Sequence, residues 1–257
     1  HGSRVFFASS SEIAFAEEDF KTAASQYETV VSKWPESTYA PYALYGKAWS
    51  QLKSKEYPAA VESFTSLLSA HKDHPLTPDA LFGRGMSRRL TSDFKGTIED
   101  IDAFLKSNPS EPNKTDALYE RGLAEVSLKD NPAAEKTFAS ILKDNPKYAG
   151  IDKVLYELAW AVKSQDKSAA AVPFFDQLAK DHPDSPLTPE ALFHVGEDQY
   201  DKKAYADAAK TYATAISKKP AGDLGERTAH KLGWANYQQK QYDAAAKAFD
   251  DQLKSFA

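Results

Sequence analysis

The sequence predicts an all-α fold, a right-handed superhelical solenoid of seven helix-turn-helix units with a period of 37 residues. Aromatic residues recur at this spacing and end in a histidine: Tyr45, Phe82, Tyr119, Tyr156, Phe193 and His230. A column of small residues keeps the same period: Ser11, Ala48, Gly85, Gly122, Ala159, Gly196 and Gly233. A mostly alanine column through Ala208 and a second, mainly aromatic column through Tyr212 do the same. A fixed period of this length is typical of repeat architectures, in which each unit packs mainly on its neighbours.

The period divides the chain into one continuous array. Units are expected near residues 4–37, 38–74, 75–111, 112–148, 149–185, 186–222 and 223–257. Residues 1–3, His-Gly-Ser, are interpreted as an expression scar. This interpretation implies that the natural N-terminus, with any signal or lipid-attachment segment, lies outside the sequence.

The first helix of a unit is expected to begin at a Thr-Pro-acid sequence. In Thr188-Pro189-Glu190 the threonine is predicted to be the N-cap and the proline the first helical residue, while the acid favours the positive helix start. The same three residue types recur at positions 77–79.

The second helix of a unit is expected to end near a proline, because proline lacks a backbone N–H and clashes with the preceding turn. Such prolines are Pro35, Pro109, Pro146, Pro183 and Pro220. The second unit has Lys72 at this position and Pro75 three residues later, which predicts a longer helix there. Pro173 lies inside the expected second helix of the fifth unit, so that helix is predicted to start late or to kink.

The columns predict how the two helices of a unit pack. A leucine column, which includes Leu155 and Leu192, lies four residues before the small column and therefore on the same helical face. The small residue is expected to let the second helix approach closely. Phe138, Phe175 and Phe249 are expected to fill the gap between units.

Composition excludes several classes of function. The chain has 32 Lys and Arg against 37 Asp and Glu, a net charge of −5, so no overall basic field argues for nucleic acid. It has no cysteine, which rules out disulfides, thiolate metal sites and cysteine nucleophiles. The sequence contains no apolar run of about 18 residues and therefore predicts no membrane-spanning segment. It also contains no glycine-rich phosphate loop or nucleophile elbow, and we predict no cofactor, no metal and no catalytic residue.

The order of small residue, aromatic, alanine, aromatic and proline resembles the tetratricopeptide repeat over essentially the whole chain. Units of that family have about 34 residues, and the three extra residues here fall after the proline, as in 183–190. The segments HPDSPLTPEALF and YADAAKTYATAI are similar to the bacterial cell-envelope subgroup, which includes the lipoprotein of the outer-membrane barrel assembly machine and the Tol-Pal-associated periplasmic coordinator. The resemblance implies a periplasmic or outer-membrane-associated location in a bacterium, with a cytoplasmic location as the alternative.

The resemblance also implies where a protein or peptide partner binds, since the first helices of tetratricopeptide arrays line the concave face. Carried over to this sequence, the predicted groove consists of Tyr45, Trp49, Phe82, Met86, Tyr119, Tyr156, Trp160, Phe193, Tyr200, His230, Trp234 and Tyr237. Large aromatic side chains and methionine anchor many interfaces. The alternative is that these residues only pack adjacent first helices together. Some members of the family bind the acidic C-terminal tails of heat-shock chaperones through lysine and asparagine side chains at these positions. This sequence has aromatic residues there instead, which argues against a chaperone tail as the ligand.

Four arginines form a predicted cationic cluster: Arg84, Arg88, Arg89 and Arg121. Arginine is suited to bidentate recognition of an anion, which is one interpretation. The other is an ion-pair seam with acids such as Asp100, Asp102 and Glu125. Arg84 and Arg121 stand where such repeats usually have leucine, so buried or half-buried acidic partners are expected.

The sequence therefore predicts a non-catalytic scaffold or adaptor. Two alternatives stay open: a helical-solenoid enzyme or carbohydrate-binding module, which needs converging polar groups in a pocket, and a purely structural assembly subunit. Leu253 and Phe256 follow Phe249 by four and seven residues, and no further helix is expected to cover them. This pattern predicts either missing downstream sequence or self-association through the C-terminal unit.

Overall fold

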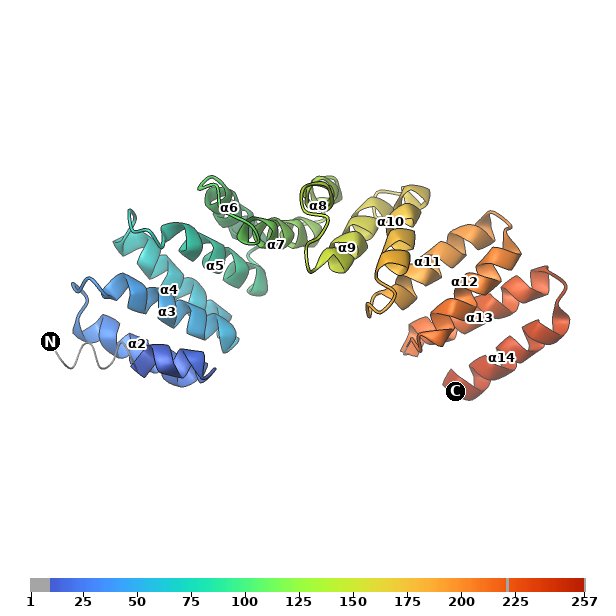
Figure 1. The fold of residues 1–257 in the computed structure, drawn as a ribbon, viewed down its shortest axis with the longest axis horizontal. Coiled ribbons are helices and arrows are strands. Elements are labelled where there is room, and N and C mark those ends of the chain that lie inside the picture. Colours follow the sequence, from blue (N-terminus) through green and yellow to red (C-terminus); the bar gives the residue numbers. More distant parts are fainter. Residues whose placement is uncertain (1–9, 221, 257) are drawn as a thin grey trace. The chain divides into compact units, whose positions relative to one another are not determined.

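The computed structural model describes residues 10–220 and 222–256, and all regular structure within these ranges is helical, with no strand (Figure 1). Residues 10–16 form the first helical segment. The helices that follow are α2 (Phe20–Lys33), α3 (Ala40–Lys53), α4 (Tyr57–Ala70), α5 (Thr77–Leu90), α6 (Phe94–Leu105), α7 (Asn113–Ser127), α8 (Asn131–Asp144), α9 (Ile151–Lys163), α10 (Ser168–Asp181), α11 (Thr188–Asp201), α12 (Tyr205–Ser217), α13 (Gly222–Gln238) and α14 (Tyr242–Phe256). The predicted all-α fold is confirmed. Residues 1–3 and the side chain of Phe256 lie outside the described part of the chain.

The chain divides into two compact units, His1–Asp130 and Asn131–Ala257. In the first unit the consecutive helices from α2 to α7 pack on one another. The same holds for α8 to α14 in the second unit, and Figure 1 shows these neighbouring helices side by side. First helices of consecutive repeats also contact each other, as in α3 with α5, α5 with α7 and α11 with α13.

The 37-residue period is kept most strictly at the starts of the second helices. These helices begin at Phe20, Tyr57, Phe94, Asn131, Ser168, Tyr205 and Tyr242. Successive starts are 37 residues apart throughout.

A left-handed turn joins the two helices of each repeat at one fixed position. Its central residue has φ between 60° and 66° and is Glu18, Lys55, Ser92, Lys129, Asp166, Lys203 or Lys240. After α3, the N–H of Glu56 donates to the carbonyl of Gln51 (2.8 Å). The N–H of Lys55 donates to the carbonyl of Leu52 (3.1 Å). These two bonds define a Schellman motif, which satisfies carbonyl groups left open at the helix end and stops the first helix there.

Small residues allow the two helices of a repeat to approach closely, as predicted. A Cβ atom added at Gly196 would lie 2.6 Å from the Tyr212 ring, and one added at Gly233 would lie even closer to the Phe249 ring. Both distances are shorter than any van der Waals contact between carbon atoms, so a larger residue would displace the aromatic ring.

Aromatic residues fill the space between repeats. Phe175 is 1% exposed, and its ring centroid lies 6.4 Å from that of Tyr156 in its own repeat and 4.8 Å from that of His194 in the next. Phe138 is fully buried, whereas Phe249 is only half-buried. Full burial of such a ring contributes roughly 1.5–3 kcal/mol.

Two expected features of the second helices, a longer α4 and a late start of α10, are not found. The helix α4 is not lengthened, because it ends at Ala70 and has 14 residues, as do α2 and α10. The helix α10 does not start late, because it begins at Ser168 and continues through Pro173. Pro173 and Ala169 are both exposed, so water can hydrate the Ala169 carbonyl that proline leaves without an N–H donor.

The predicted N-cap role of Thr188 is also wrong. Thr188 is the first residue of α11 and follows Leu187 at the N-cap, and its hydroxyl donates to the carbonyl of His182 at 2.7 Å. The hydroxyl of Thr77 donates in the same way to the carbonyl of His71 at 3.2 Å. The threonine therefore ties a first helix to the end of the preceding second helix instead of capping its own helix.

Candidate partner-binding site

The predicted groove residues differ in exposure. Trp234 (41%) and Tyr237 (49%) are exposed, as is His230. The half-buried members are Tyr45, Trp49, Phe82, Met86, Tyr119, Tyr156, Trp160 and Tyr200. Phe193 is only 1% exposed and packs on Tyr212, with ring centroids 6.1 Å apart. Phe193 therefore belongs to the core and not to the surface of a groove.

The first unit has an aromatic hollow between the first two repeats, with a volume of about 440 Å³. It is lined by Glu12, Phe15, Tyr27, Tyr39, Tyr42, Tyr45, Gly46 and Trp49, and we call it the Tyr42 hollow. Tyr42 is 48% exposed, and no basic residue is among the described residues that line the hollow. The site is therefore an aromatic surface with a single carboxylate.

Helical spacing gathers these side chains. Tyr42, Tyr45 and Trp49 lie three and four residues apart on α3, so they share one face of that helix. Tyr39 immediately precedes α3, and its ring centroid lies 5.9 Å from that of Tyr42. The rings of Tyr45 and Trp49 are 6.1 Å apart and meet edge to face, a favourable arrangement for aromatic pairs.

Three tyrosines of the hollow have raised pKa values. Burial, with a smaller contribution from the charge of Glu12, raises the pKa of Tyr27 to about 12. Burial also raises the pKa of Tyr39, whose hydroxyl donates a hydrogen bond to the Glu12 carboxylate. Burial likewise raises the pKa of Tyr45. Glu12 carries the one carboxyl group in the described lining.

The Tyr42 hollow lies at a contact that recurs between consecutive first helices. In this contact, which we call the slot, a residue near the end of one first helix faces the residue 31 positions later. Three slots are filled by pairs of side chains: Arg89 with Glu120, Lys163 with His194, and Tyr200 with Lys231. The corresponding residues in the Tyr42 hollow are Phe15 and Gly46. Glycine has no side chain to fill the hollow, and the buried ring of Tyr27 packs directly against its backbone, because a Cβ atom at position 46 would lie 2.5 Å from that ring.

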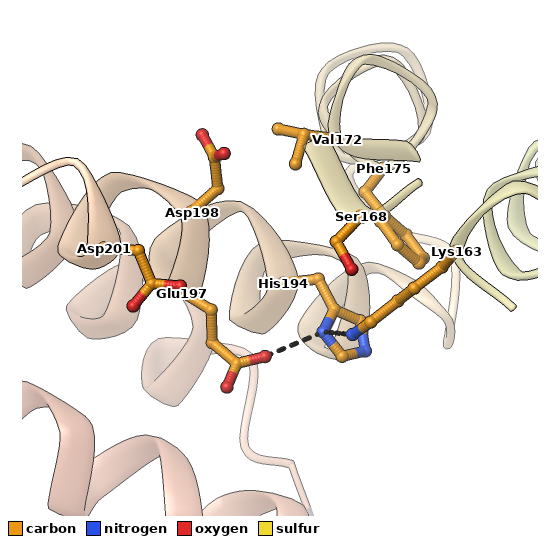
Figure 2. A pocket seen from close by; sticks show the side chains of 8 residues that line it. All are labelled: Lys163, Ser168, Val172, Phe175, His194, Glu197, Asp198 and Asp201. Atoms are coloured by element: carbon orange, nitrogen blue, oxygen red, sulfur yellow. Dashed lines mark hydrogen bonds and ion pairs between the residues drawn. The ribbon is translucent and has the colours of Figure 1, made fainter. Parts of the chain in front are cut away.

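The second unit has a smaller and more polar pocket of about 200 Å³ around His194 (Figure 2). The His194 ring is 7% exposed, and its centroid lies 4.8 Å from that of Phe175 and 5.0 Å from that of Trp160. Its Nδ1 atom lies 2.8 Å from Nζ of Lys163 and 3.0 Å from a carboxylate oxygen of Glu197, as the dashed lines in Figure 2 mark. Asp198, also in the lining, pairs with Lys202 at 2.7 Å.

The electrostatics of this polar pocket follow from burial and from its own charges. Burial lowers the pKa of the Lys163 ammonium. Burial alone raises the pKa of the Glu197 carboxyl, but the hydrogen bond and charge of His194 outweigh it, so the pKa lies below its usual range. Nδ1 of His194 accepts from Lys163 or donates to Glu197, depending on the tautomer, and the Lys163 contact links α9 to α11.

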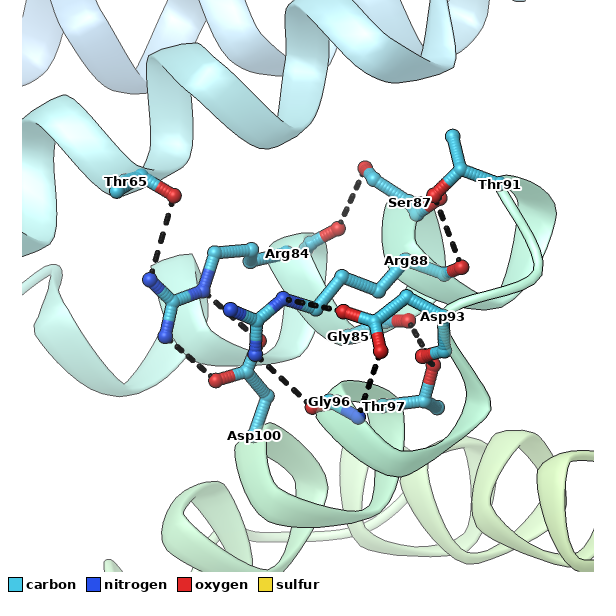
Figure 3. Close-up of polar contacts among 11 residues, drawn as sticks. Thr65, Arg84, Gly85, Ser87, Arg88, Thr91, Asp93, Gly96, Thr97 and Asp100 are labelled. Atoms are coloured by element: carbon cyan, nitrogen blue, oxygen red, sulfur yellow. Dashed lines mark hydrogen bonds and ion pairs between the residues drawn. The ribbon is translucent and has the colours of Figure 1, made fainter.

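The arginine cluster forms ion pairs in the first unit (Figure 3). Arg84 on α5 donates two hydrogen bonds to the Asp100 carboxylate on α6, at 2.8 and 2.6 Å, and a third to Thr65 on α4 at 3.3 Å. Arg88 also pairs with Asp100, at 3.0 Å. Asp100 is buried, with 4% of its side chain exposed, so the ion pairs lie in the packed interface between helices.

The other two arginines of the cluster are also paired. Arg89 pairs with Glu120, and Arg121 lies 3.3 Å from Asp102 and 3.2 Å from Glu125. Each arginine of the cluster is therefore paired with an acidic side chain of the chain itself. This pairing favours the ion-pair seam over the anion site.

The C-terminal repeat carries a further run of aromatic residues. The ring of Trp234 lies 5.6 Å from that of Tyr237, which in turn lies 5.5 Å from that of Tyr242. The indole N–H of Trp234 donates to Nε2 of His230 at 2.9 Å. Tyr242 is 58% exposed, so these rings form an accessible surface.

Sequence reasoning missed several residues of these sites. Tyr42 was missed because it precedes the aromatic column by three residues, although this spacing on a helix signals a shared face. Tyr39 and His194 have no counterpart of the same type in neighbouring repeats, so the period gives no signal for them. Among the described residues, no group of three His, Asp or Glu side chains is arranged to hold a metal ion. No helix in the described part of the chain is both long and apolar enough to span a membrane.

The fold defines the class of protein. Repeated helix pairs that meet across small residues are characteristic of tetratricopeptide repeats, and a tetratricopeptide repeat model matches residues 11–71. A second family model matches more than half of the chain, residues 42–195, and is described as YfiO, outer membrane lipoprotein. The chain belongs to this family.

Solved structures share the fold. The C-terminal part of a tetratricopeptide repeat protein from Cytophaga hutchinsonii has a TM-score of 0.72 and 14% identity, with 95% of this chain and 93% of that chain covered. A tetratricopeptide repeat protein from Parabacteroides merdae has a TM-score of 0.66 and 18% identity, with 99% and 93% covered. The pilF protein of Pseudomonas aeruginosa has a TM-score of 0.60 and 14% identity, with 84% and 91% covered. The search of curated proteins returned no match.

Proposed function

We propose that this protein is a non-catalytic scaffold that binds a segment of a partner protein on its first helices, with the Tyr42 hollow as the principal contact. The observation that carries the proposal is the hollow itself, in which five half-buried or exposed aromatic rings surround an open space of about 440 Å³. Rigid aromatic side chains bury a large area at little entropic cost, which makes them typical anchors of protein interfaces.

The bacterial envelope is the proposed location. Support comes from the family model described as an outer membrane lipoprotein. Cell fractionation of the source bacterium, with an antibody against this chain, tests the location. We expect the protein in the envelope fractions, and recovery in the cytoplasmic fraction alone would refute this part of the proposal.

Site-specific photo-crosslinking in the source cells tests the binding surface. A photoreactive phenylalanine analogue at Tyr42 is expected to form a discrete adduct with a partner protein. The same analogue at Glu62, an exposed residue on α4, is the matched control and is expected to form none. An adduct of equal yield from both positions, or none from Tyr42, would contradict the proposed surface.

The polar pocket around His194 is the feature closest to the rival enzyme interpretation. An enzyme needs polar groups that converge on a substrate, whereas Lys163, His194 and Glu197 converge on one another. His194 is also buried between two aromatic rings. These contacts favour a role in holding consecutive repeats together.

A further inference from the structure

The second unit contains a slot in which the chain binds one of its own lysines. The Nζ atom of Lys231 lies 3.7 Å from a carboxylate oxygen of Glu197 and 5.6 Å from the centroid of the Tyr200 ring. A carboxylate and the face of an aromatic ring both attract an ammonium group. This slot is therefore a lysine site filled from within the molecule.

The Tyr42 hollow has the same two recognition groups but no lysine. Five repeats earlier in the sequence, the positions of Glu197, Tyr200 and Lys231 are occupied by Glu12, Phe15 and Gly46. Glu12 and Phe15 both line the hollow, and Gly46, which also lines it, contributes no side chain of its own. The hollow thus has the carboxylate and the aromatic ring of the lysine site without the chain's own lysine.

Further differences between the two slots favour a cation in the hollow. The positions held by Leu224, Arg227 and His230 in the second unit are held by Tyr39, Tyr42 and Tyr45 in the first. Arg227 places a positive charge beside its slot, whereas tyrosine adds a ring whose negative face attracts cations. The hydroxyl of Tyr39 donates to the Glu12 carboxylate and so orients it at the hollow.

We propose that the Tyr42 hollow binds a protonated lysine side chain of the partner protein. This inference rests on the proposed function, because it specifies the chemistry of the same binding surface. The aliphatic stem of the lysine packs among the rings, and its ammonium group pairs with Glu12. An acidic segment is disfavoured at this site, because it would bring a second negative charge to the carboxylate.

Two peptides of matched size test the proposal on the full chain. The peptides are acetyl-Gly-Lys-Gly-amide and acetyl-Gly-norleucine-Gly-amide, which differ in the ammonium group. Binding is followed by NMR through the indole signal of Trp49, which is identified with the Trp49→Phe variant. We expect the lysine peptide to bind about fivefold or more tightly than the norleucine peptide, since cation–π and carboxylate contacts act together. Equal affinity would show an apolar site and overturn the proposal.

Charge-neutral variants supply the controls. Glu12→Gln, at an exposed position, is expected to abolish the preference for lysine while leaving norleucine binding unchanged. Glu62→Gln, which removes an exposed carboxylate from α4, is expected to retain the preference. A preference that survives Glu12→Gln would overturn the assignment of the carboxylate.

A gain-of-function variant tests the comparison with the slot that Lys231 fills in the second unit. Lys231→Ala vacates the slot of the second unit, and we expect the lysine peptide then to perturb the indole signal of Trp234 as well.

If the Tyr42 crosslink forms but the lysine preference is missing, the lysine inference fails and the proposed binding surface stands. If the preference is present but no crosslink forms, the hollow is a lysine site and the proposed partner surface fails.

Discussion

At the residue scale, Trp160 and Trp234 occupy equivalent positions two repeats apart but have different surroundings. The ring of Trp160 lies between Phe175, at 6.1 Å, and His194, at 5.0 Å. Trp234 is 41% exposed. We expect Trp160→Ala to lower the free energy of unfolding by about 3 kcal/mol, because it removes packing between repeats. Trp234→Ala is expected to lower it by about 0.5 kcal/mol. Urea unfolding of the two variants measures both values, and equal losses would contradict the difference in burial.

Buried tyrosines predict how stability depends on alkaline pH. Burial raises the pKa of both Tyr27 and Tyr156 to about 12, and the hydroxyl of Tyr156 also donates to Glu190. In the unfolded chain a tyrosine has a pKa of about 10. A group whose pKa is higher in the folded state contributes stability that is fully present below the unfolded pKa and is lost as pH rises through the folded pKa. Stability is therefore expected to fall between pH 10 and pH 12.

The variant Tyr156→Phe tests this dependence. Phenylalanine has no ionisable hydroxyl, so the loss of unfolding free energy between pH 10 and pH 12 is expected to be smaller than in the unmodified protein. Tyr42→Phe removes an exposed hydroxyl and serves as the control, for which we expect the original slope. An unchanged slope in Tyr156→Phe would show that this hydroxyl does not contribute.

At the scale of the element, the helix ends show where local sequence signals fail. Threonine before proline is a common N-cap signal, yet Thr188 is already helical and bonds to the preceding helix. Pro75 does not extend α4, because the chain turns at His71 as it turns at His182 in a later repeat. In both cases the packing of neighbouring helices fixes the end of the helix, and the residues at the boundary adapt to it.

Pro173 provides a test of helix α10. Proline in a helix interior removes one backbone hydrogen bond and strains the preceding turn. Because Pro173 is exposed, Pro173→Ala changes no packed surface and restores the N–H that can donate to the Ala169 carbonyl. We expect the free energy of unfolding to rise by about 1–3 kcal/mol. Thermal unfolding measures the change, and a lower melting temperature would show that proline is required in the folded state.

At the scale of the whole molecule, the exposed apolar residues of the last two helices predict self-association. Leu253 is 67% exposed and Tyr242 is 58% exposed. Large apolar side chains left exposed at the end of an array can form a contact with a second molecule. We expect light scattering to show a mass that rises with protein concentration and falls to that of the monomer in Leu253→Lys. Asp250→Lys, which places a lysine at an exposed position of the same helix, is expected to associate more strongly than Leu253→Lys. Identical masses for all three proteins would contradict the prediction.

Much of the fold could be predicted from the sequence, because each packing role recurs at one position of the period. The small residue at Gly196 and the ring of Tyr212 identify the close helix contact by their spacing alone. The candidate site was less predictable for the same reason. The Tyr42 hollow combines a glycine at position 46, which recurs only as Gly83 in the next repeat, with Tyr39 and Tyr42, whose positions hold no tyrosine in later repeats. A method that searches for what the repeats share overlooks a site that depends on residues present in one repeat alone.

Other parts of the site depend on contacts that no single helix contains. Phe193 belongs to the same column as Tyr45, yet it is buried under Arg227, which lies 4.6 Å above its ring and comes from the next first helix. Burial of a first-helix residue is therefore decided by the side chains of the following repeat. The period predicts the position of the column, but it does not predict which members stay exposed.

The left-handed turn between paired helices affects how repeats can be gained or lost by recombination within the gene. The turn has nearly the same φ in each described copy, although its central residue is lysine, glutamate, serine or aspartate and never glycine in those copies. Recombination between two such turns would join helix ends that already have matching backbone geometry, so no new loop has to evolve. Duplication or loss of one full period then lengthens or shortens the array without disturbing the joint. Inherited variants of this protein are therefore expected to differ by whole repeats more readily than by parts of one.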